Sequence, residues 1–585
     1  MYSKKILSVL PLLIITGMLL AACQPAAASP TAKPVSVVAT VAPTEAPVVP
    51  TVAPTEAPVP MWEKAFVIDE SLVSGRVAKK VGSAPKHGGI LTMAIIDITH
   101  FDPVSIAADV EPYSLVFEPL FELDSEWNPT PLLAESQEMS ADGLVHTIKL
   151  RKGIKFHDGS DFNAAVVKWN FDRKIAQKSP YVKEIPFANN PVAVVDDYTI
   201  TITLAKPSFV MYKYLCGSSW MMYSKQFVEG VTADDLKNRG IGTGPYVLKE
   251  YLPGDRIVVD ANPNYWQAGM PFFEQVVMRV VPDAQARLLM LQAGEVQWIK
   301  DLSIQDFTRL EGNKDIVAAA NPGTRTYFIA PHHMRRPFDD VRVRQALNYG
   351  VDKQAMQDVI FENKLKVSTG LVTASVKGSM PNEPYAYNPE KAMALLDEAG
   401  VVDTNGDGFR EVDGKEKAFI FFGRKGRSAG DSEIQETFAA YMAAIGLNVK
   451  IEIQDGAQFF TILNQPYGQA PYYDLSNQSP SNFIADLSYP LETQYSCKSW
   501  PGTAFNYAHY CNKTADALIN EGNSAITLEE RNAKYNAAQK IMWEEAVVIW
   551  LFDGLLTSAT APSLKGVFSD GAHNTWQVKY AWFSQ

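Results

Sequence analysis

Residues 418–438 read AFIFFGRKGRSAGDSEIQETF and contain, in order, a strand pattern, a glycine-rich turn and a helix pattern. The run 419–422 is apolar and aromatic, which is typical of a buried strand. After Gly430, apolar residues recur at helical spacing, beginning with Ile434 and Phe438. A strand that passes through a short loop into a helix is a building unit of α/β folds. The segment therefore predicts α/β architecture around it.

Strand and helix patterns of the same kind extend in both directions, from Gly88 to the C-terminus. Apolar or alternating runs predict strands at GGILTMAII (88–96), LVHTIKL (144–150), YTITITL (198–204), DRIVVD (255–260) and QVVMRVV (275–281). Apolar residues at helical spacing predict helices at 163–175, 284–294, 340–360, 388–400, 432–446 and 528–545. With 585 residues, 46% of them hydrophobic, we expect two or three lobes.

Gly426, Ser428 and Gly430 form a Gly-x-Ser-x-Gly motif, which in α/β hydrolases places a nucleophilic serine between a strand and a helix. In that turn the strand runs straight into the first glycine, whereas Arg424 and Lys425 intervene here. No histidine after Ser428 stands in a recognisable catalytic setting. We therefore interpret the segment as a loop without a catalytic serine, and an exported serine hydrolase is the alternative.

The two arginines of this loop, Arg424 and Arg427, carry the stronger functional signal. A guanidinium group grips a carboxylate through two parallel hydrogen bonds. These residues predict a carboxylate-binding loop, and the alternative is two solvated surface charges.

The first 23 residues, MYSKKILSVLPLLIITGMLLAAC, have the layout of a secretory signal. Two lysines precede an apolar stretch that is short for a membrane span, and small residues precede Cys23. The last four residues resemble the lipobox of bacterial lipoproteins, in which the cysteine is acylated. We expect residues 1–22 to be removed and Cys23 to anchor the chain to the outer face of the bacterial cytoplasmic membrane.

Residues 24–60 are dominated by Pro, Ala, Val and Thr, and TVAPTEAPV occurs twice, at 40–48 and 51–59. Such a composition cannot offset the entropy lost on ordering. We expect residues 23–85 to form a disordered tether between the anchor and the folded part.

Charge and cysteine usage narrow the classes of partner. The net charge is −12, which argues against a nucleic-acid partner because phosphates require clustered Lys and Arg.

With Cys23 acylated, Cys497 and Cys511 can close a loop as a disulfide in an oxidising compartment, which contributes roughly 3 kcal/mol. Cys216 is expected as a small buried side chain. Neither Cys-x-x-Cys nor His-x-x-x-His occurs, so zinc has little support.

Residues 403–414, DTNGDGFREVDG, match the first half of an EF-hand calcium loop. Asp403, Asn405 and Asp407 supply oxygens at alternate positions, and a glycine follows at the sharp turn. The twelfth position is a glycine where the EF-hand has a bidentate Glu. Two acids of the same loop are candidate substitutes: Glu411 and Asp413. Calcium is therefore one expectation and a metal-free Asx-rich turn is the other; no cofactor is required.

Residues 471–511 are dense in Tyr, Trp, Asn, Ser and Gln. Flat apolar faces beside amide and hydroxyl groups are typical of the wall of a small-molecule pocket. The candidates here are Asn482, Trp500 and Tyr510, and the alternative is that these aromatic side chains pack into the core.

Several segments resemble the family 5 extracellular solute-binding proteins and occur along the chain in the order found in that family. Four of the longest show the resemblance. They are HTIKLRKGIKFHDGSDFNAAVVKWNFDR (146–173), GTGPYVLKEYLPGDRIVVDANPNYW (242–266), PFDDVRVRQALNYGVDK (337–353) and YNPEKAMALLDEAG (387–400). Proteins of this family are the substrate-binding components of ABC importers for dipeptides, oligopeptides, nickel complexes and some oligosaccharides. The resemblance covers nearly everything from about residue 86 to the end.

The resemblance implies an α/β, two-lobed periplasmic-binding-protein-like fold (type II, cluster C) with an extra domain on the first lobe. The implied boundaries are 86–123, 216–330 and 546–585 for lobe I, 124–215 for the extra domain and 331–545 for lobe II. Strands near 321–330 and 547–552 would bend as the hinge. The resemblance also implies that the protein is a monomer without enzymatic activity and delivers its solute to an ABC permease. A further implication is a disulfide between Cys497 and Cys511.

In dipeptide-binding members an arginine near the place of Arg424 or Arg427 holds the ligand carboxylate. An aspartate pairs with the ligand amine in a Trp-rich stretch that matches 474–483. That stretch reads DLSNQSPSNF here and has no tryptophan, so Asp474 or Asp486 would have to serve instead. A peptide is the expected solute, and the alternatives are an oligosaccharide, an opine-like compound or a metal chelate.

Overall fold

The computed structural model describes residues 86–96, 101–102, 111–124, 127–424, 430–454, 456–465, 468, 472–482, 484–502, 504–567 and 578–584. Cys23, Arg427 and Ser428, which carry three of the sequence predictions, lie outside the described residues.

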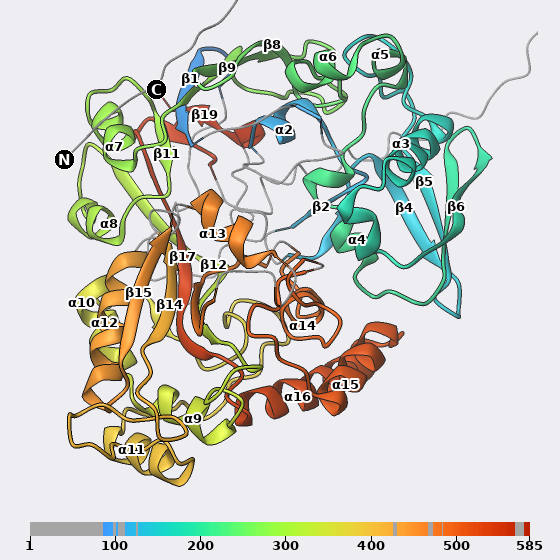
Figure 1. The fold of residues 1–585 in the computed structure, drawn as a ribbon. Coiled ribbons are helices and arrows are strands. Elements are labelled where there is room, and N and C mark those ends of the chain that lie inside the picture. The colour runs from blue at the N-terminus through green and yellow to red at the C-terminus, as the bar shows by residue number, and fades with distance from the viewer. Residues whose placement is uncertain are drawn as a thin grey trace, which may run out of the picture. The chain divides into compact units, whose positions relative to one another are not determined.

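One large mixed sheet organises the described part of the chain (Figure 1). Its order is β15 (Val449–Gln454), β14 (Phe419–Arg424), β16 (Leu475–Gln478), β12 (Val317–Pro331), β17 (Ile549–Thr560), β11 (Trp298–Lys300), β1 (Ile90–Ile95), β10 (Gln275–Val280), β9 (Arg256–Ala261) and β8 (Tyr246–Leu252). β13 (Lys366–Val367) pairs with β17 beside this path. The strands expected at 88–96, 255–260 and 275–281 are β1, β9 and β10.

β12 and β17 are the long strands that join the two ends of this sheet. β12 pairs with β17 from Val317 to Ile329, and its last residues also pair with β16. At its other end β17 pairs with β11. The register between β12 and β17 shifts twice in the middle, between Pro322 and Thr326 and again after Tyr327. Register shifts interrupt the hydrogen-bond ladder and bend the strand.

The segment quoted first contains a strand and a helix where its pattern predicts them: β14 ends at Arg424, and α12 (Asp431–Ala444) is the next helix. β14 is parallel to both neighbours, β15 and β16. Phe421 and Phe438 pack edge to face, with ring centroids 5.3 Å apart, because the apolar faces of strand and helix meet there. The prediction of an α/β fold is confirmed.

Helices lie beside the strands at both ends of the large sheet. They are α2 (Glu111–Val116), α5 (Lys225–Glu229), α6 (Ala233–Asn238), α7 (Ala284–Gln292), α8 (Ile304–Leu310), α9 (Val341–Tyr349), α10 (Lys353–Phe361), α11 (Pro389–Glu398), α13 (Gly456–Leu463), α14 (Ser488–Gln494), α15 (Lys513–Ser524) and α16 (Leu528–Glu544). The prediction of one helix over 340–360 is wrong: α9 ends at Gly350, and the Asp352 side chain caps α10 by accepting from the Ala355 N–H.

A second sheet of four antiparallel strands lies within the segment expected as the extra domain. Its order is β4 (Ala134–Met139), β5 (Val145–Leu150), β7 (Thr199–Leu204) and β6 (Phe187–Asp196). α3 (Ala164–Ala176) packs on it through Val167 and Phe171, and α4 (Met211–Tyr214) follows. Small pairs complete the sheets: β2 (Phe121–Leu123) with β3 (Pro129–Pro131), and β18 (Leu564–Lys565) with β19 (Trp582–Phe583).

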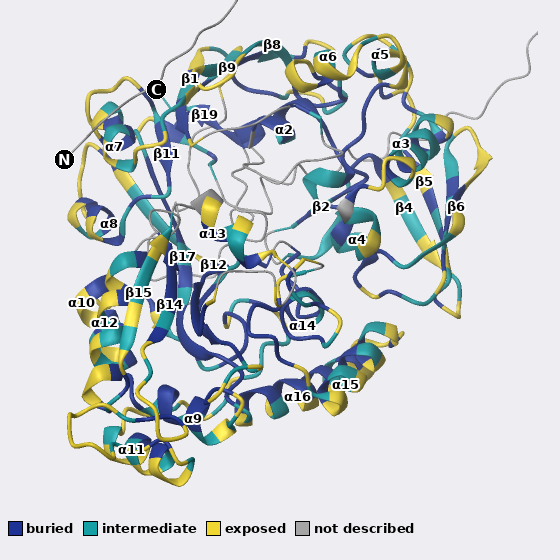
Figure 2. Ribbon diagram, viewed as in Figure 1, coloured by how far each residue is buried: buried dark blue, intermediate teal, exposed yellow. Residues whose placement is uncertain are grey.

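Burial follows this plan (Figure 2). β17 is buried along most of its length, and so is the second half of β12, whereas α7 and α11 expose their outer turns. One core cluster fills the space between these strands, β14 and helices α9, α10 and α12. Among the described residues, no helix is both long enough and apolar enough to cross a membrane.

Candidate functional site

The carboxyl ends of β14 and β16 lie side by side, because these strands are parallel neighbours. β14 ends at Arg424, and Ser479 follows the last residue of β16. β12 brings Arg325 to the same edge, where the Thr326 N–H donates to the Pro480 carbonyl at 3.2 Å. Ligands of open α/β sheets bind outside the carboxyl ends of the strands. This edge is therefore the candidate site.

The guanidinium group of Arg424 is held from several sides and is 1% exposed. Its Nη2 donates to Ser479 Oγ, and its Nε lies 3.5 Å from Asp431 Oδ2. The backbone carbonyl of Arg424 accepts from Gln435 Nε2 at 2.9 Å. The guanidinium carbon lies 5.5 Å from the centre of the Phe459 ring. These contacts fix the orientation of the cation within the protein.

Gly423 allows α12 to approach β14 at this point. A Cβ atom at Gly423 would lie 1.8 Å from Gln435 Oε1, far inside van der Waals contact. Only glycine therefore lets Gln435 reach the carbonyl of Arg424, the next residue.

Arg325 brings a second guanidinium group to the same serine. Its Nη1 donates to the Ser479 carbonyl at 2.6 Å. Asn477 Nδ2 donates to Asp431 Oδ1 at 3.2 Å, so the carboxylate is shared between a cation and an amide. Asp431 also occupies the first turn of α12, where the partial positive charge of a helix N-terminus stabilises an acid. We call Arg325, Arg424, Asp431, Asn477 and Ser479 the arginine cluster.

The arginine cluster favours an anion. The Arg424 guanidinium group pairs with the Asp431 carboxylate, and Arg325 brings a second positive charge to Ser479, which Arg424 also contacts. Burial lowers the pKa of Arg424, and the charge of Asp431 opposes that shift. Coulomb attraction is stronger in a buried setting than in water, so a ligand carboxylate at this edge would be attracted.

Asp474 lies at the opposite end of β16 from the arginine cluster. It is fully buried, and Lys417 Nζ lies 3.2 Å from its Oδ1. The Tyr472 hydroxyl donates to the same oxygen at 2.7 Å, and the Ile420 N–H donates to Oδ2 at 2.9 Å. The structure does not bring this candidate to Arg424. Its contacts tie the amino end of β14 to β16.

Asp486 and Asn482 belong to the loop that follows the cluster. Asp486 accepts from the Arg531 guanidinium, and Lys213 Nζ lies 3.4 Å away. Burial opposes ionisation, but the charges of Arg531 and Lys213 hold the pKa of Asp486 below its ordinary value. Asn482 donates its backbone N–H to Thr324 Oγ1 at 3.2 Å and its amide to the Asp486 carbonyl at 2.8 Å. This loop thus connects the cluster to an internal ion pair.

Trp500 is half-buried and Tyr510 is buried. The Trp500 ring lies 5.5 Å from that of His509. The Tyr510 hydroxyl donates to Glu545 Oε2 at 2.7 Å, and its ring belongs to a core cluster with Trp543 and Trp550. Beside them the structure joins two cysteines in a disulfide: Cys497 and Cys511. Cys216 is buried in the core of the four-stranded sheet unit, where its thiol donates to the Tyr212 carbonyl at 3.2 Å.

Arg325, Asp431 and Asn477 did not emerge from the sequence as site residues. Arg325 gave one signal, since it is a lone cation in the strand pattern of NPGTRTYFIA at 321–330. Asp431 gave no such signal, because an acidic residue is common in the first turn of a helix, where it interacts favourably with the helix N-terminus. Their proximity depends on the pairing of β14, β16 and β12, which are distant in sequence.

Comparisons with known proteins place the chain in a family. The model of the bacterial extracellular solute-binding proteins, family 5 Middle, matches residues 128–502. The glutathione-binding protein GsiB of Salmonella typhimurium is 32% identical over 452 residues, which are 77% of this chain and 85% of that protein.

Solved structures show the same fold. The chain matches NikA from Brucella suis, in complex with Fe(III)-EDTA, with a TM-score of 0.75 and 24% identity, over 85% of this chain and 100% of that one. It matches the oligopeptide-binding protein AppA from Bacillus subtilis, in complex with a nonapeptide, with a TM-score of 0.72 and 22% identity, over 86% of this chain and 100% of that one. The two-lobed solute-binding fold expected from the sequence is confirmed.

Proposed function

Because the chain belongs to the bacterial extracellular solute-binding proteins of family 5, we propose that it captures a short anionic peptide at the arginine cluster. The protein is a substrate-binding component of an ABC importer. The observation that carries the choice of solute is the convergence of Arg325 and Arg424 on Ser479, at the edge where Arg424 also pairs with Asp431.

Two further observations support a peptide with carboxylates. The relatives at about a third identity are named for glutathione, which is an anionic tripeptide. The acids expected to pair with a ligand amine, Asp474 and Asp486, are each occupied by a lysine or arginine of the protein itself. Recognition in this proposal therefore rests on ligand carboxylates more than on a ligand amine.

Capture proceeds without chemical change to the solute. The proposed lobes are those expected from the sequence, with the extra domain at 124–215, and closure bends β12 and β17 at their register shifts. A solute stabilises the closed form only by its greater affinity for that form. The exported serine hydrolase remains an outcome of the test: a bound peptide recovered cleaved, with cleavage lost in Ser428→Ala, would establish it.

The affinity test uses calorimetry with matched ligands and matched variants. Glutathione should bind, and its derivative with both carboxylates amidated should bind at least tenfold more weakly. Arg325→Gln should weaken glutathione binding at least tenfold, because one guanidinium group is lost. Arg279→Gln is the control, since Arg279 pairs with Glu295 on the surface. Equal affinity for the amidated ligand, or no effect of Arg325→Gln, would overturn the proposal.

A metal chelate or an oligosaccharide is distinguished in the same titration. A neutral oligosaccharide that binds where peptides do not would favour the sugar alternative, because it carries no carboxylate. A chelate that binds only when loaded with metal would favour the chelate alternative.

Membrane attachment through Cys23 is part of the proposal. Its support is the LAAC sequence at 20–23, after a signal-like segment. Intact-mass spectrometry of the protein from a bacterial host should show an acylated N-terminal cysteine. Cys23→Ala should release the protein from the membrane fraction, and a wild-type protein that starts at another residue would refute the anchor.

A further inference from the structure

We propose that residues 403–411, the loop between α11 and β14, bind one calcium ion through Asp403, Asp407 and Glu411. One carboxylate oxygen from each of these three residues lies within 4.8 Å of the others. Calcium is a hard cation that takes six to eight oxygen ligands, with carboxylates prominent among them.

Glu411 provides the observation that separates this loop from an ordinary acidic surface turn. The residue is 4% exposed, and its Oε2 accepts from the backbone N–H and the hydroxyl of Thr404, at 2.7 and 2.8 Å. Its Oε1 is buried and has no hydrogen-bond partner in the described part of the chain. A buried carboxylate oxygen without a partner is costly, and a cation beside it would remove that cost.

The charges around the loop point to the same ligand. Within the described ranges, no Lys or Arg forms an ion pair with Asp403, Asp407 or Glu411. The nearest arginine in sequence, Arg410, is used elsewhere: its Nη1 pairs with Asp397 and its Nε donates to the Ile445 carbonyl at 2.9 Å. Three carboxylates therefore stand together without a compensating cation from the protein.

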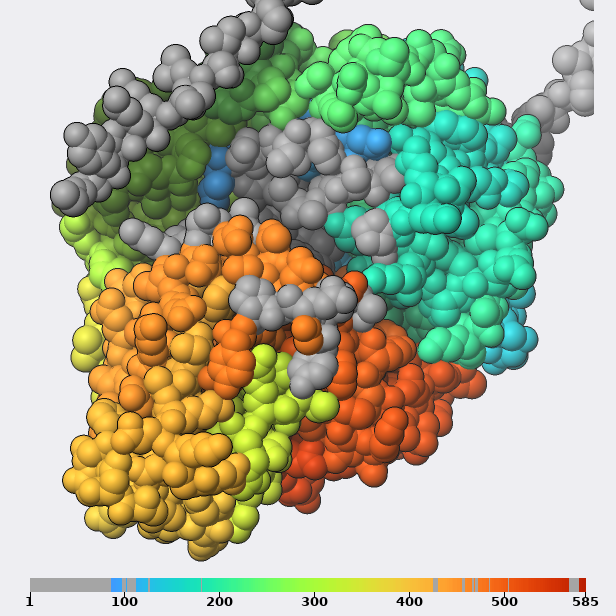
Figure 3. Space-filling view, in the orientation of Figure 1, coloured from blue at the N-terminus to red at the C-terminus, as the bar shows by residue number. Residues whose placement is uncertain are grey.

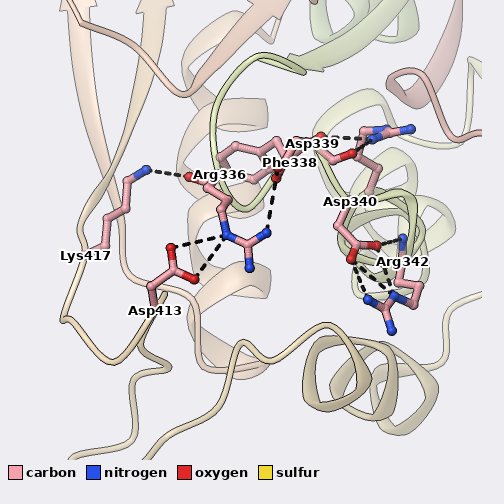
Figure 4. A network of polar contacts seen from close by, with 8 residues as sticks. Arg336, Phe338, Asp339, Asp340, Arg342, Asp413 and Lys417 are labelled. Atoms are coloured by element: carbon pink, nitrogen blue, oxygen red, sulfur yellow. Dashed lines mark hydrogen bonds and ion pairs between the residues drawn. The ribbon is translucent and has the colours of Figure 1, made fainter. Parts of the chain in front are cut away.

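The structure also decides between the two substitutes for the missing Glu. Figure 4 shows Asp413 turned toward Arg336, whose Nε lies 3.1 and 3.2 Å from its two oxygens. Lys417 donates to the Arg336 carbonyl at 2.8 Å in the same network. Asp413 is thus committed to an ion pair, and Glu411, the ninth position of the loop, joins the cluster instead. Position nine is a ligand position of the EF-hand, often through water.

Asn405 lies in the same loop, and its Oδ1, the atom that could ligate calcium, accepts from the Asp407 N–H at 2.9 Å. Its Nδ2 donates to Asp407 Oδ2 at 3.3 Å and to Glu416 Oε1 at 3.0 Å, so the amide already lies against the acids. Arg410 fixes the loop to both neighbouring helices, because it bonds Asp397 of α11 and the carbonyl after α12. A bound ion would therefore brace the amino end of β14, opposite the end that carries Arg424.

The test is calorimetric titration of the full exported chain with CaCl₂ after treatment with EDTA. We expect one site per chain, with a dissociation constant on the order of 10⁻⁴ M, as in extracellular modules. Asp407→Asn and Glu411→Gln should each weaken binding at least tenfold. Asp413→Asn is the matched control, since it removes a carboxylate of the same loop that faces Arg336, and it should leave the affinity unchanged.

Other outcomes decide the proposal without reference to the transported solute. Calcium should raise the melting temperature of the wild type, and EDTA should reverse the rise. Asp407 is exposed, so Asp407→Asn should fold even if Glu411→Gln does not. No saturable calcium binding by the wild type, an unchanged affinity in Asp407→Asn, or MgCl₂ binding as tightly as CaCl₂ would overturn the proposal.

Discussion

Asp486 is a buried carboxylate between two cations from distant parts of the sequence. Lys213 belongs to α4, next to the four-stranded sheet, and Arg531 belongs to α16. Figure 3 shows residues near 200 in contact with the orange and red C-terminal third on one face of the protein. The ion pair therefore connects the segment proposed as the extra domain to the proposed second lobe.

Replacing Asp486 with Ala should lower the free energy of unfolding by about 3–5 kcal/mol, because Arg531 would be left buried and unpaired. Urea denaturation measures the change. Asp413→Asn breaks an ion pair that is half exposed and should cost less than about 1 kcal/mol. A similar loss in both variants would show that the network around Asp486 is not special.

His332 and His509 form a buried stack with ring centroids 4.0 Å apart. Burial lowers the pKa of His509 to about 4, from an ordinary 6.5, and the positive charge of Arg335 adds to the shift. The unfolded chain then binds more protons than the folded chain between pH 4 and 6.5. Stability should therefore fall as the pH falls through that window.

His509→Asn should reduce this pH dependence by up to about 1.4 kcal/mol per pH unit, the effect of one proton. Asn is chosen because His509 has φ of +53°, a conformation that Asn tolerates. The measurement is the melting temperature from pH 4 to 7. An unchanged slope in His509→Asn would contradict the assignment.

At the scale of elements, α15 and α16 pack closely at one glycine. A Cβ atom at Gly522 would lie 2.3 Å from the Tyr535 ring, so Gly522→Ala must push the helices apart. We expect a loss of about 1–3 kcal/mol in the free energy of unfolding, as for other overpacked sites. Glu521→Ala is the control, because its ion pair with Lys534 is exposed. Urea denaturation that finds both variants equally stable would refute the close packing.

Elements were the best-predicted level, because periodicity is a local property. The strand-loop-helix pattern at 418–438 and the helix at 528–545 correspond to β14, α12 and α16. The prediction of a single helix at 340–360 was wrong, because apolar residues continue at helical spacing on both sides of Gly350. The Asp352 side chain, which caps the new helix α10, changes the sequence pattern at only one position.

The site was less predictable, because proximity within it depends on strand order. Arg424 was proposed from the local pattern of 418–438, and the structure places it at the end of β14, whereas Arg325 and Ser479 reach it only through the order β14-β16-β12. Asp474 has the residue type expected of an amine partner, yet lies at the wrong end of β16 for a ligand at Arg424. Residue type can be read from sequence, whereas the end of the strand that faces a ligand cannot.

At the scale of the whole molecule, β12 and β17 connect the two ends of the large sheet, so movement between the ends must bend them. Small-angle scattering should show a smaller radius of gyration when a binding solute is added. The amidated peptide is the control and should leave the curve unchanged. A curve that stays the same with a solute that calorimetry shows to bind would contradict closure.

The most direct measurement is a crystal structure of the protein with the solute that binds best. We predict an intact solute whose carboxylate accepts hydrogen bonds at the carboxyl ends of β14 and β16, from Arg325 or another group of the arginine cluster. A solute bound elsewhere, a solute without an anionic group at this edge, or a cleaved product would contradict the account.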